Sequence, residues 1–169
     1  MRDRPKRSAL QGQPPRRRLP RKVSAQFRRH VSHCKVPLMT IVGLGMDATE
    51  VGRIAESLER YGDRFLRRVF TDEEIAYCMR RKFPAPHLAG RFAAKEAGMK
   101  AIGTGHAFGV LWRDLEVVRR GGPPQLQFHN AAGDHFKRLG ASKALLTITH
   151  TDALALAHVI LVGEPVTAR

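Results

Sequence analysis

The spacing of hydrophobic residues changes several times between residues 39 and 162 of this chain. Over residues 50–61 apolar side chains recur every three or four positions with charged residues between them, which predicts an amphipathic helix. Over residues 111–118 apolar and polar residues alternate instead, as in a strand with one buried face. The same criteria predict strands over 40–42, 126–128, 144–149 and 155–162, and helices over 71–81, 87–102 and 131–139.

Start and stop signals support these boundaries. Thr71 and Glu74 have the spacing of a capping box, so the second helix is expected to begin there. Pro84 and Pro86 are expected to interrupt the chain before the third helix, and Gly103-Thr104-Gly105 to end that helix. Helices and strands follow one another without regular βαβ alternation, so we expect an α+β fold rather than a doubly wound sheet.

Residues 1–38 differ in composition from the rest of the chain. They carry twelve of the 30 Lys and Arg residues and one acid, Asp3, with too few apolar residues to form a core. We therefore expect a basic disordered extension, 1–38, and one domain, 39–169. Three interpretations of the extension stay open. Met39 is the true start and the extension lies upstream of it, the extension is a flexible tail, or it is a targeting peptide or an arm for acidic partners.

Composition disfavours several classes of protein. Cys34 and Cys78 have neither CxxC nor Cys/His spacing, so we expect no disulfide framework and no zinc site, and Cys78 as a buried or half-buried thiol. No apolar run approaches the roughly 20 residues of a transmembrane helix. We expect a cytoplasmic protein that binds no membrane and no nucleic acid. A small nucleic-acid-binding module remains an alternative, but most of the positive charge lies in the extension.

The third predicted helix carries the first candidate for catalysis. Leu88, Phe92, Glu96 and Lys100 are spaced by four residues and therefore share one face. The two apolar members indicate that this face turns toward the core, where a carboxylate needs a cation or a metal beside it. The simpler alternative is an ordinary ion pair between Glu96 and Lys100 at a solvated edge.

A glycine-rich segment carries the second candidate. Gly43-Leu44-Gly45-Met46-Asp47-Ala48 follows the first predicted strand and fits the dinucleotide-binding pattern G-x-G-x-x-[G/A]. A small nicotinamide- or flavin-dependent oxidoreductase is therefore an alternative function. Asp47 opposes it, because its negative charge would face the pyrophosphate. An aspartate on a glycine-flanked turn is instead a suitable oxygen ligand for Mg²⁺.

Other polar residues are weaker candidates. His150, at the end of a predicted strand, is as compatible with packing as with ligand binding. Arg64, Arg67 and Arg68 are expected to form a solvated charged run. His33, His87, His106 and His129 have no metal-ligand spacing and are expected at the surface.

Six segments, taken in order, resemble the holo-acyl-carrier-protein synthase family: Gly43–Asp47, Arg53, Phe70-Thr71-x-x-Glu74, Leu88–Ala97, Lys100–Gly105 and Ile148–Thr151. The run from Arg91 to Ala97 followed by Lys100 is the most specific part. Gly98, where the family commonly has a larger apolar residue, and Asn130, where glycine is usual, depart from the pattern. The resemblance implies helices packed on a mostly antiparallel sheet, and a homotrimer whose active sites are shared between subunits.

The resemblance also implies the reaction. The family transfers the 4′-phosphopantetheine group from coenzyme A to a serine of an apo-acyl-carrier protein, releases 3′,5′-ADP and depends on Mg²⁺. Asp47 and Glu96 would hold the metal, and the serine would be deprotonated either by Glu96 or by a metal-bound water. Lys95 is expected to serve packing or charge balance. The remaining implied roles are phosphate neutralisation by Lys100, coenzyme A contact by Lys100, Gly103, Thr104, Gly105, Arg91 and His150, and carrier binding by Arg53.

Overall fold

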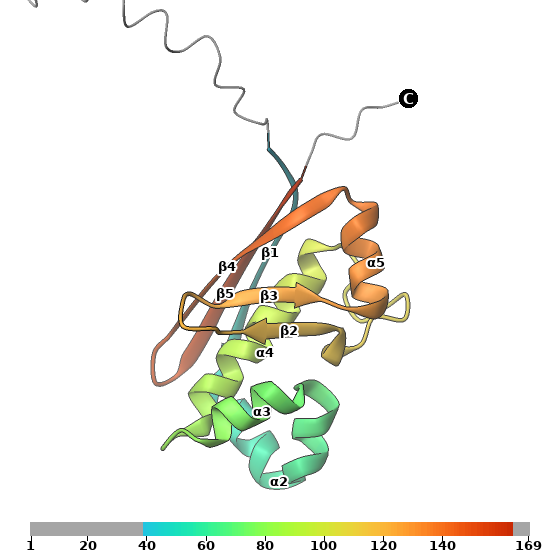
Figure 1. The fold of residues 1–169 in the computed structure, drawn as a ribbon. Coiled ribbons are helices and arrows are strands. Elements are labelled where there is room, and N and C mark those ends of the chain that lie inside the picture. The colour runs from blue at the N-terminus through green and yellow to red at the C-terminus, as the bar shows by residue number, and fades with distance from the viewer. Residues whose placement is uncertain (1–38, 164–169) are drawn as a thin grey trace, which may run out of the picture. The chain divides into compact units, whose positions relative to one another are not determined.

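The computed structural model describes residues 39–163, so the expectations for residues 1–38 lie outside it. The elements are, in order, β1 (Thr40–Glu50), α2 (Val51–Val69), α3 (Asp72–Met79), α4 (Pro84–Ala101), the 3₁₀ turn η1 (Trp112–Asp114), β2 (Leu115–Val118), β3 (Gln125–Phe128), α5 (Asn130–Arg138), β4 (Ala141–His150) and β5 (Leu154–Gly163). This mixed order, drawn in Figure 1, confirms the α+β class.

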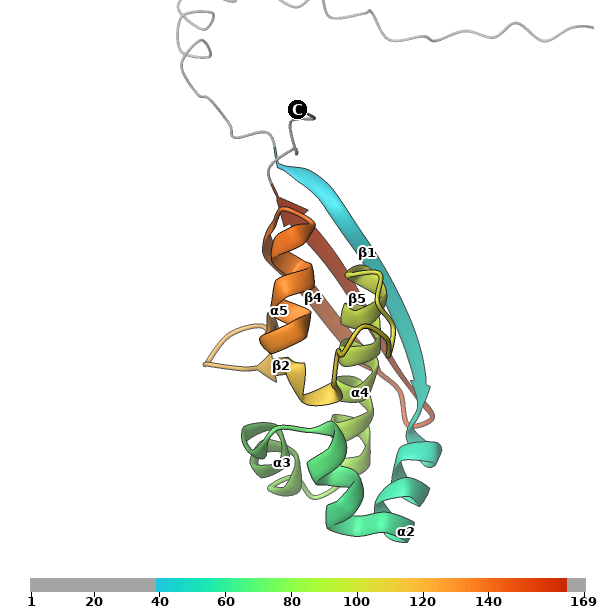
Figure 2. The same ribbon diagram turned by 90° about the vertical axis from the view of Figure 1, so that its right-hand side faces the viewer.

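Two antiparallel sheets enclose the central helix. The larger has the strand order β1-β5-β4, and the smaller is the hairpin β2-β3. Helix α4 lies along one face of the larger sheet, and the hairpin packs on the opposite side of α4 (Figures 1 and 2). Helices α2 and α3 lie beside the first half of α4, and α5 lies beside β4. The expected packing of helices on an antiparallel sheet is confirmed.

Strand β1 is longer than the sequence predicted, because the segment around Gly43 and Gly45 is strand rather than turn. A Cβ on Gly43 would overlap the carbonyl oxygen of Ala101, and one on Gly45 would overlap that of Ala97. Both positions need glycine because the backbone of α4 passes too close for a side chain. The expected glycine-flanked turn at Asp47 is therefore wrong.

Helix α4 forms the centre of the hydrophobic core. Its fully buried alanines are Ala89, Ala93, Ala94 and Ala97. On the side of the hairpin, a Cβ on Gly98 would overlap the side chains of Leu115 and Leu126. The unusual glycine at this position thus lets β2 and β3 pack closely on α4, which offsets its lower helix propensity.

Several local expectations are confirmed. Thr71 and Glu74 form the capping box at the start of α3. Asn130, which stands where the family usually has glycine, adopts a positive φ of 45° at the start of α5, a conformation that asparagine tolerates better than most residues. Cys78 is fully buried, and burial raises the pKa of its thiol to about 11.

Several helix and strand boundaries differ from the expectations. Helix α2 continues to Val69 through non-helical backbone at Gly62, with φ 48° and ψ −129°. Pro84 begins α4 instead of interrupting the chain, because the first turn of a helix needs no N–H donor there. Residues 112–114 form a 3₁₀ turn, so β2 begins only at Leu115. Between residues 39 and 163 no helix is both long and apolar enough to cross a membrane.

Candidate active site

Asp47 lies on the side of β1 that faces α4. Alternate strand residues share a face, and Gly43 and Gly45 contact the helix on this side. The Asp47 carboxylate accepts one hydrogen bond from the Thr49 hydroxyl (2.8 Å) and one from the Lys100 ammonium (2.8 Å). Lys100 therefore binds Asp47 across the β1–α4 contact.

Glu96 lies where its face of α4 emerges from the core. Leu88 at the start of this face is fully buried, the Glu96 side chain is 21% exposed and the Lys100 side chain is 48% exposed. Glu96 Oε1 lies 2.7 Å from His106 Nε2. The simpler alternative of an ion pair between Glu96 and Lys100 is wrong, because each side chain has a different partner.

His106 is the residue at this site that the sequence did not identify. It is solvent-exposed, as expected, but its ring contacts the Glu96 carboxylate and lies 4.4 Å, centroid to centroid, from the Trp112 ring. Gly103 and Gly105 both have positive φ, 76° and 53°, and so turn the chain back past the end of α4. The two glycines were the only sequence signal for this return.

The two carboxylates suit a hard cation. Asp47 and Glu96 are both partly exposed and come from elements that pack directly together. Among residues 39–163, no group of three or more His, Cys, Asp or Glu is arranged to hold a metal. Mg²⁺ needs no such group, because it binds through one or two carboxylates and takes its other ligands from water and phosphate oxygens. These residues therefore fit a magnesium ion bound together with a phosphate-containing substrate.

The backbone N–H groups of the loop after α4 already donate hydrogen bonds within the protein. The N–H of Gly103 donates to the carbonyl of Lys100, and those of Thr104 and Gly105 donate to the carbonyl of Met99. The Thr104 side chain is buried and its hydroxyl donates to the Gly105 carbonyl (3.2 Å). Contact between this loop and coenzyme A stays a prediction, and it cannot use these N–H groups without a rearrangement.

Arg91 and His150 line a single cavity of about 250 Å³, together with Tyr77, His87 and Arg119. Arg91 is only 7% exposed. Its Nη1 donates to the His87 carbonyl (3.3 Å), and its Nε has no hydrogen-bond partner among the described residues. A buried cation without an acid beside it is costly unless an anion binds. The cavity is therefore suited to a phosphate group.

His87 belongs to this cavity rather than to the open surface. It is half-buried, and its ring centroid lies 6.0 Å from that of His150. Burial, followed by the positive charges of Arg81, His150, Arg91 and Arg119, lowers the pKa of His87. The expectation of a surface residue was wrong here because histidine on a helix carries no signal of which side is covered.

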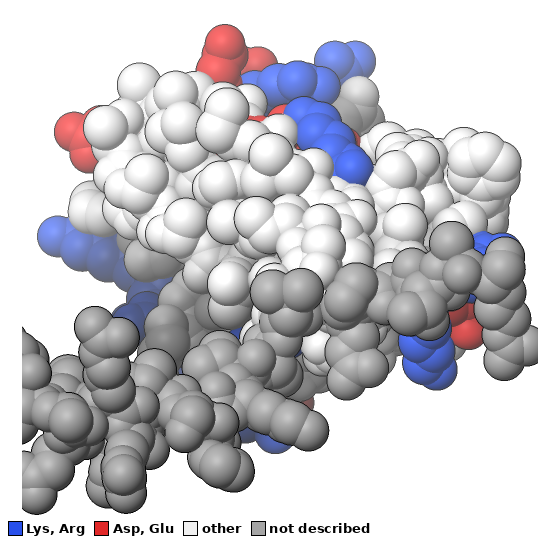
Figure 3. Space-filling view, turned by 90° about the horizontal axis from the view of Figure 1, so that it is seen from above, with Lys and Arg blue, Asp and Glu red and all other residues white. Residues whose placement is uncertain are grey.

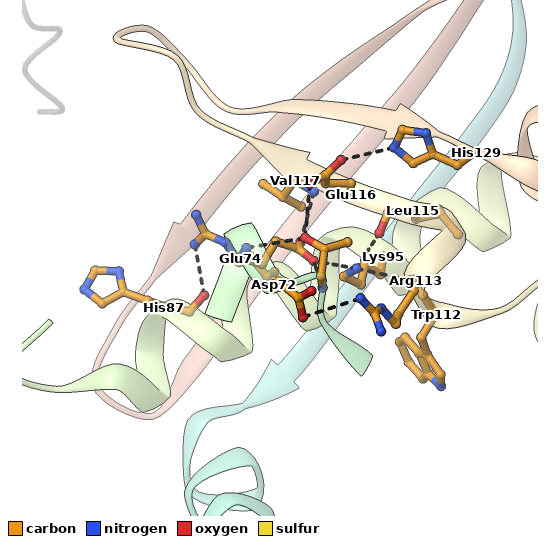
Figure 4. A network of polar contacts seen from close by, with 12 residues as sticks. Asp72, Glu74, His87, Lys95, Trp112, Arg113, Leu115, Glu116, Val117 and His129 are labelled. Atoms are coloured by element: carbon orange, nitrogen blue, oxygen red, sulfur yellow. Dashed lines mark hydrogen bonds and ion pairs between the residues drawn. The ribbon is translucent and has the colours of Figure 1, made fainter. Parts of the chain in front are cut away.

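Lys95 and Glu74 form a buried ion pair, shown in Figure 4. Their side chains are 0% and 1% exposed, and Lys95 Nζ lies 2.7 Å from Glu74 Oε2. Lys95 also donates to the carbonyls of Trp112 and Leu115, and Glu74 accepts from the N–H of Val117 (3.0 Å). Burial lowers the pKa of Lys95, and the charge of Glu74 opposes this shift. These contacts confirm that Lys95 serves charge balance and packing.

Arg53 is exposed on α2, away from the buried pair. Arg64, Arg67 and Arg68 on the same helix are also exposed, as expected of a solvated run. The contact of Arg53 with a carrier protein stays a prediction.

The comparison with known proteins decides the family. The sequence profile of the 4′-phosphopantetheinyl transferase superfamily matches residues 43–157. This chain belongs to that superfamily. A holo-[acyl-carrier-protein] synthase of Solibacter usitatus is 53% identical over 122 residues, which cover 72% of this chain and 98% of the relative. One of Koribacter versatilis is 50% identical with the same coverage.

Solved structures of phosphopantetheinyl transferases share the fold. Holo-[acyl-carrier-protein] synthase of Neisseria meningitidis has a TM-score of 0.66 and 31% identity, with 72% of this chain and 98% of that chain covered. The enzyme of Bacillus anthracis, in complex with coenzyme A (3′,5′-ADP), has a TM-score of 0.61 and 34% identity, with coverage of 73% and 98%. The resemblance to holo-acyl-carrier-protein synthases is confirmed, and the chain is an enzyme of this transferase class.

Membership of the phosphopantetheinyl transferase superfamily removes the dinucleotide-binding alternative. The glycine pattern lies inside β1, where the glycines accommodate α4, and it forms no loop that opens a helix. A phosphate-cradling dinucleotide loop needs such an opening. The oxidoreductase interpretation is therefore wrong.

Proposed function

We propose that this enzyme transfers the 4′-phosphopantetheine group of coenzyme A to a serine of an apo-acyl-carrier protein, with Mg²⁺ bound by Asp47 and Glu96. The observation that carries the proposal is the placement of these two partly exposed carboxylates on β1 and α4, each beside a cationic or protonatable side chain. The related enzyme of Bacillus anthracis has been solved with coenzyme A (3′,5′-ADP) bound, which supports the same substrate here.

In the proposed reaction the serine oxygen attacks the phosphorus that bears pantetheine, and the bond from that phosphorus to the bridging oxygen breaks. The product 3′,5′-ADP departs with this oxygen. Mg²⁺ supplies neutralisation of the phosphate charge. Lys100 holds the Asp47 carboxylate and can shift its ammonium to a phosphate oxygen when the metal is bound. Glu96 is held by His106 and is available to accept the serine proton.

The cavity at Arg91 and His150 is proposed to bind a second phosphate of the same substrate. Coenzyme A carries a pyrophosphate and a separate 3′-phosphate, so two anion sites are needed. Arg91 precedes Glu96 by five residues on α4, which corresponds to about 7.5 Å along a helix. If the pyrophosphate binds at the two carboxylates, the 3′-phosphate is the group left for the arginine cavity.

We also propose that the enzyme is a homotrimer assembled through the face of its larger sheet that is turned away from α4. On this face Leu44, Ile160 and Leu145 form one row across β1, β5 and β4. Leu44 is 60% exposed, and Leu145 43%. Figure 3 likewise shows a broad area without Lys, Arg, Asp or Glu. Exposed apolar surface of this kind is typical of an interface between subunits.

Carrier binding is assigned to the arginines of α2. Arg53, Arg64, Arg67 and Arg68 are all exposed, and acyl carrier proteins are acidic, so opposite charges would speed their encounter. A cytoplasmic location and a role in fatty-acid synthesis stay predictions.

A carrier-mass assay tests the proposed function. The purified full chain is incubated with coenzyme A, apo-acyl-carrier protein and Mg²⁺, and the carrier is analysed by mass spectrometry with and without EDTA. We expect the carrier to gain one phosphopantetheine group, and EDTA to abolish the gain. A gain that persists in EDTA would contradict the metal assignment, and no gain with several acyl carrier proteins would contradict the reaction.

A further inference from the structure

Tyr77 on α3 contacts three arginines from three different segments. The guanidinium carbon of Arg91 lies 4.1 Å from the centre of the Tyr77 ring, and that of Arg81 lies 4.5 Å from it. Arg119, which follows β2, donates from Nη1 to the Tyr77 hydroxyl (3.3 Å). These contacts are within the range of cation–π interactions and a hydrogen bond. One aromatic side chain thus gathers three positive charges.

No acid pairs with these three arginines, Arg81, Arg91 and Arg119, in the described part of the chain. An acid at the position of Tyr77 would hold them equally well, but it would cancel charge and compete with an anionic ligand for their N–H groups. An aromatic ring attracts a guanidinium through its face and leaves the N–H donors free.

The two acids that line the neighbouring cavity are not paired with these arginines. Glu73 and Glu116 line an adjoining cavity of about 300 Å³ that also includes Tyr77, Arg91 and Arg119. The Glu116 carboxylate already accepts hydrogen bonds from the Thr71 hydroxyl (3.1 Å) and contacts His129 (3.1 Å). Glu73 is exposed and has no recorded ion pair within the described range. The cluster therefore stays positive overall.

We propose that Tyr77 is a positioning residue that holds Arg91, Arg81 and Arg119 around the cavity for a phosphate monoester, and that it thereby sets a preference for coenzyme A over dephospho-coenzyme A. The inference rests on the proposed function, because it names the 3′-phosphate of the substrate as the group recognised. A phosphate monoester carries a charge of about −1.5 to −2 at neutral pH, against −1 for a diester, so it gains most from several gathered cations.

The ionisation of Tyr77 is consistent with this role. Burial would raise the pKa of Tyr77, but the hydrogen bonds and charges of Arg119 and Arg81 outweigh it and lower the pKa below 10.0. A phosphate bound among these arginines would offset their charge and raise the pKa of Tyr77 again. Ultraviolet titration of the phenol should therefore show an upward shift when adenosine 3′,5′-bisphosphate is added. A role of Tyr77 in packing alone would produce no such shift.

Steady-state kinetics of variants test the proposal directly. Full-length wild type, Tyr77→Leu, Tyr77→Met and Tyr77→Phe are each assayed with coenzyme A and with dephospho-coenzyme A, after circular dichroism has established which variants are folded. The matched control is Tyr61→Leu, because Tyr61 also has an arginine over its ring, Arg60 at 5.2 Å, but lies outside the cavity.

We expect Tyr77→Leu and Tyr77→Met to raise the KM for coenzyme A about tenfold, as loss of one to two cation–π contacts implies, with kcat little changed. The KM for dephospho-coenzyme A should change by less than about twofold. Tyr77→Phe keeps the ring and should stay within about threefold of wild type. Tyr61→Leu should match wild type with both substrates.

Two outcomes would overturn the inference. Equal increases in KM for both substrates would show that Tyr77 does not act through the 3′-phosphate. Unchanged KM values in the folded Tyr77→Leu or Tyr77→Met variant would show that the arginines need no aromatic support. Neither outcome bears on the proposed transfer reaction, which would be contradicted if the wild-type enzyme modified no carrier protein.

Discussion

Two buried cations, Lys95 and Arg91, lie four residues apart on α4 and have opposite surroundings. Lys95 is fully buried, and its ammonium contacts a carboxylate and two carbonyl groups. Arg91 is nearly as buried, but it contacts one carbonyl and one aromatic ring and has an unpartnered Nε. The first charge is neutralised inside the protein, so it ties elements together. Among residues 39–163 no recorded ion pair neutralises the second.

The largest expected effect is the loss of stability when the ion pair between Lys95 and Glu74 is broken. Glu74→Ala leaves Lys95 buried without its acid, so the free energy of unfolding should fall by about 3–5 kcal/mol. Thermal or urea denaturation measures it. Asp72→Ala, in the same first turn of α3, is the matched control: its ion pair with Arg113 is long (3.5 Å) and exposed, so it should cost about 1 kcal/mol or less. Equal losses in both variants would contradict the comparison.

Substitution of the carboxylates in the candidate active site should reduce activity rather than stability. Asp47→Asn and Glu96→Gln should each lower kcat/KM by at least about 100-fold, because a charged metal ligand is lost from the transition state. Their melting temperatures should change little, since both side chains are partly exposed. Asp134→Asn, an exposed residue of α5, is the control. Near wild-type activity in either variant would remove that residue from the metal site.

Substitution of Arg53 tests whether the exposed cations of α2 bind the acyl carrier protein. Arg53→Glu reverses one charge on α2, so the KM for the acyl carrier protein should rise about tenfold while the KM for coenzyme A stays constant. Added salt should reduce the difference between variant and wild type, because it screens exposed charges. Arg138→Glu on α5 serves as the control. A parallel rise in both KM values would argue against a carrier contact.

The lowered pKa of His87 predicts a smaller effect, a pH dependence of the free energy of unfolding. The pKa of His87 in the folded protein lies below the ordinary value of 6.5. At pH values between the folded-state pKa and 6.5, the unfolded chain therefore binds more protons than the folded protein. The free energy of unfolding should therefore fall as pH decreases below 6.5, by at most about 1.4 kcal/mol per pH unit from this group. Urea denaturation from pH 5 to pH 8 should show a weaker dependence in His87→Gln. An unchanged slope would contradict the shift.

The smallest expected effect is that of the basic extension. Removal of residues 1–38 should leave kcat/KM for coenzyme A and for the carrier unchanged, because every residue assigned to the site lies between Asp47 and His150. A carrier-mass assay and size-exclusion chromatography measure activity and assembly. Loss of either would show that the extension contributes to catalysis or to the trimer.

Much of the fold and some of the site could be predicted from the sequence. The capping box at Thr71 and the dense alanines of α4 carry strong local signals, because hydrogen-bond geometry and helical spacing are properties of neighbouring residues. The role of Gly43 and Gly45 could not be predicted, because it depends on Ala101 and Ala97 of α4, more than 50 residues away in the chain. The same pattern of glycines is compatible with a turn and with a strand that touches a helix.

The contacts of the charged residues show the same limit. Spacing placed Glu96 and Lys100 on one helical face, but it could not show that Lys100 would bind Asp47 and Glu96 would contact His106. Likewise, Tyr77, His87 and Arg119 come from three segments, and only the packing of α3, α4 and the hairpin brings them into one cavity. The sequence alone could not show which residues of distant segments would contact each other.

The position of β5 in the middle of the larger sheet has a consequence for biosynthesis. β1 and β4 have no contact as neighbouring strands, and both pair with β5, the last strand of the described chain. A nascent chain on the ribosome can form α2, α3 and α4 early, but β1 must wait more than 100 residues for its partner. Such non-local pairing slows folding and exposes strand edges in the meantime. Within the described chain, the strand that carries Asp47 is therefore the first strand synthesised and among the last to be fixed in place.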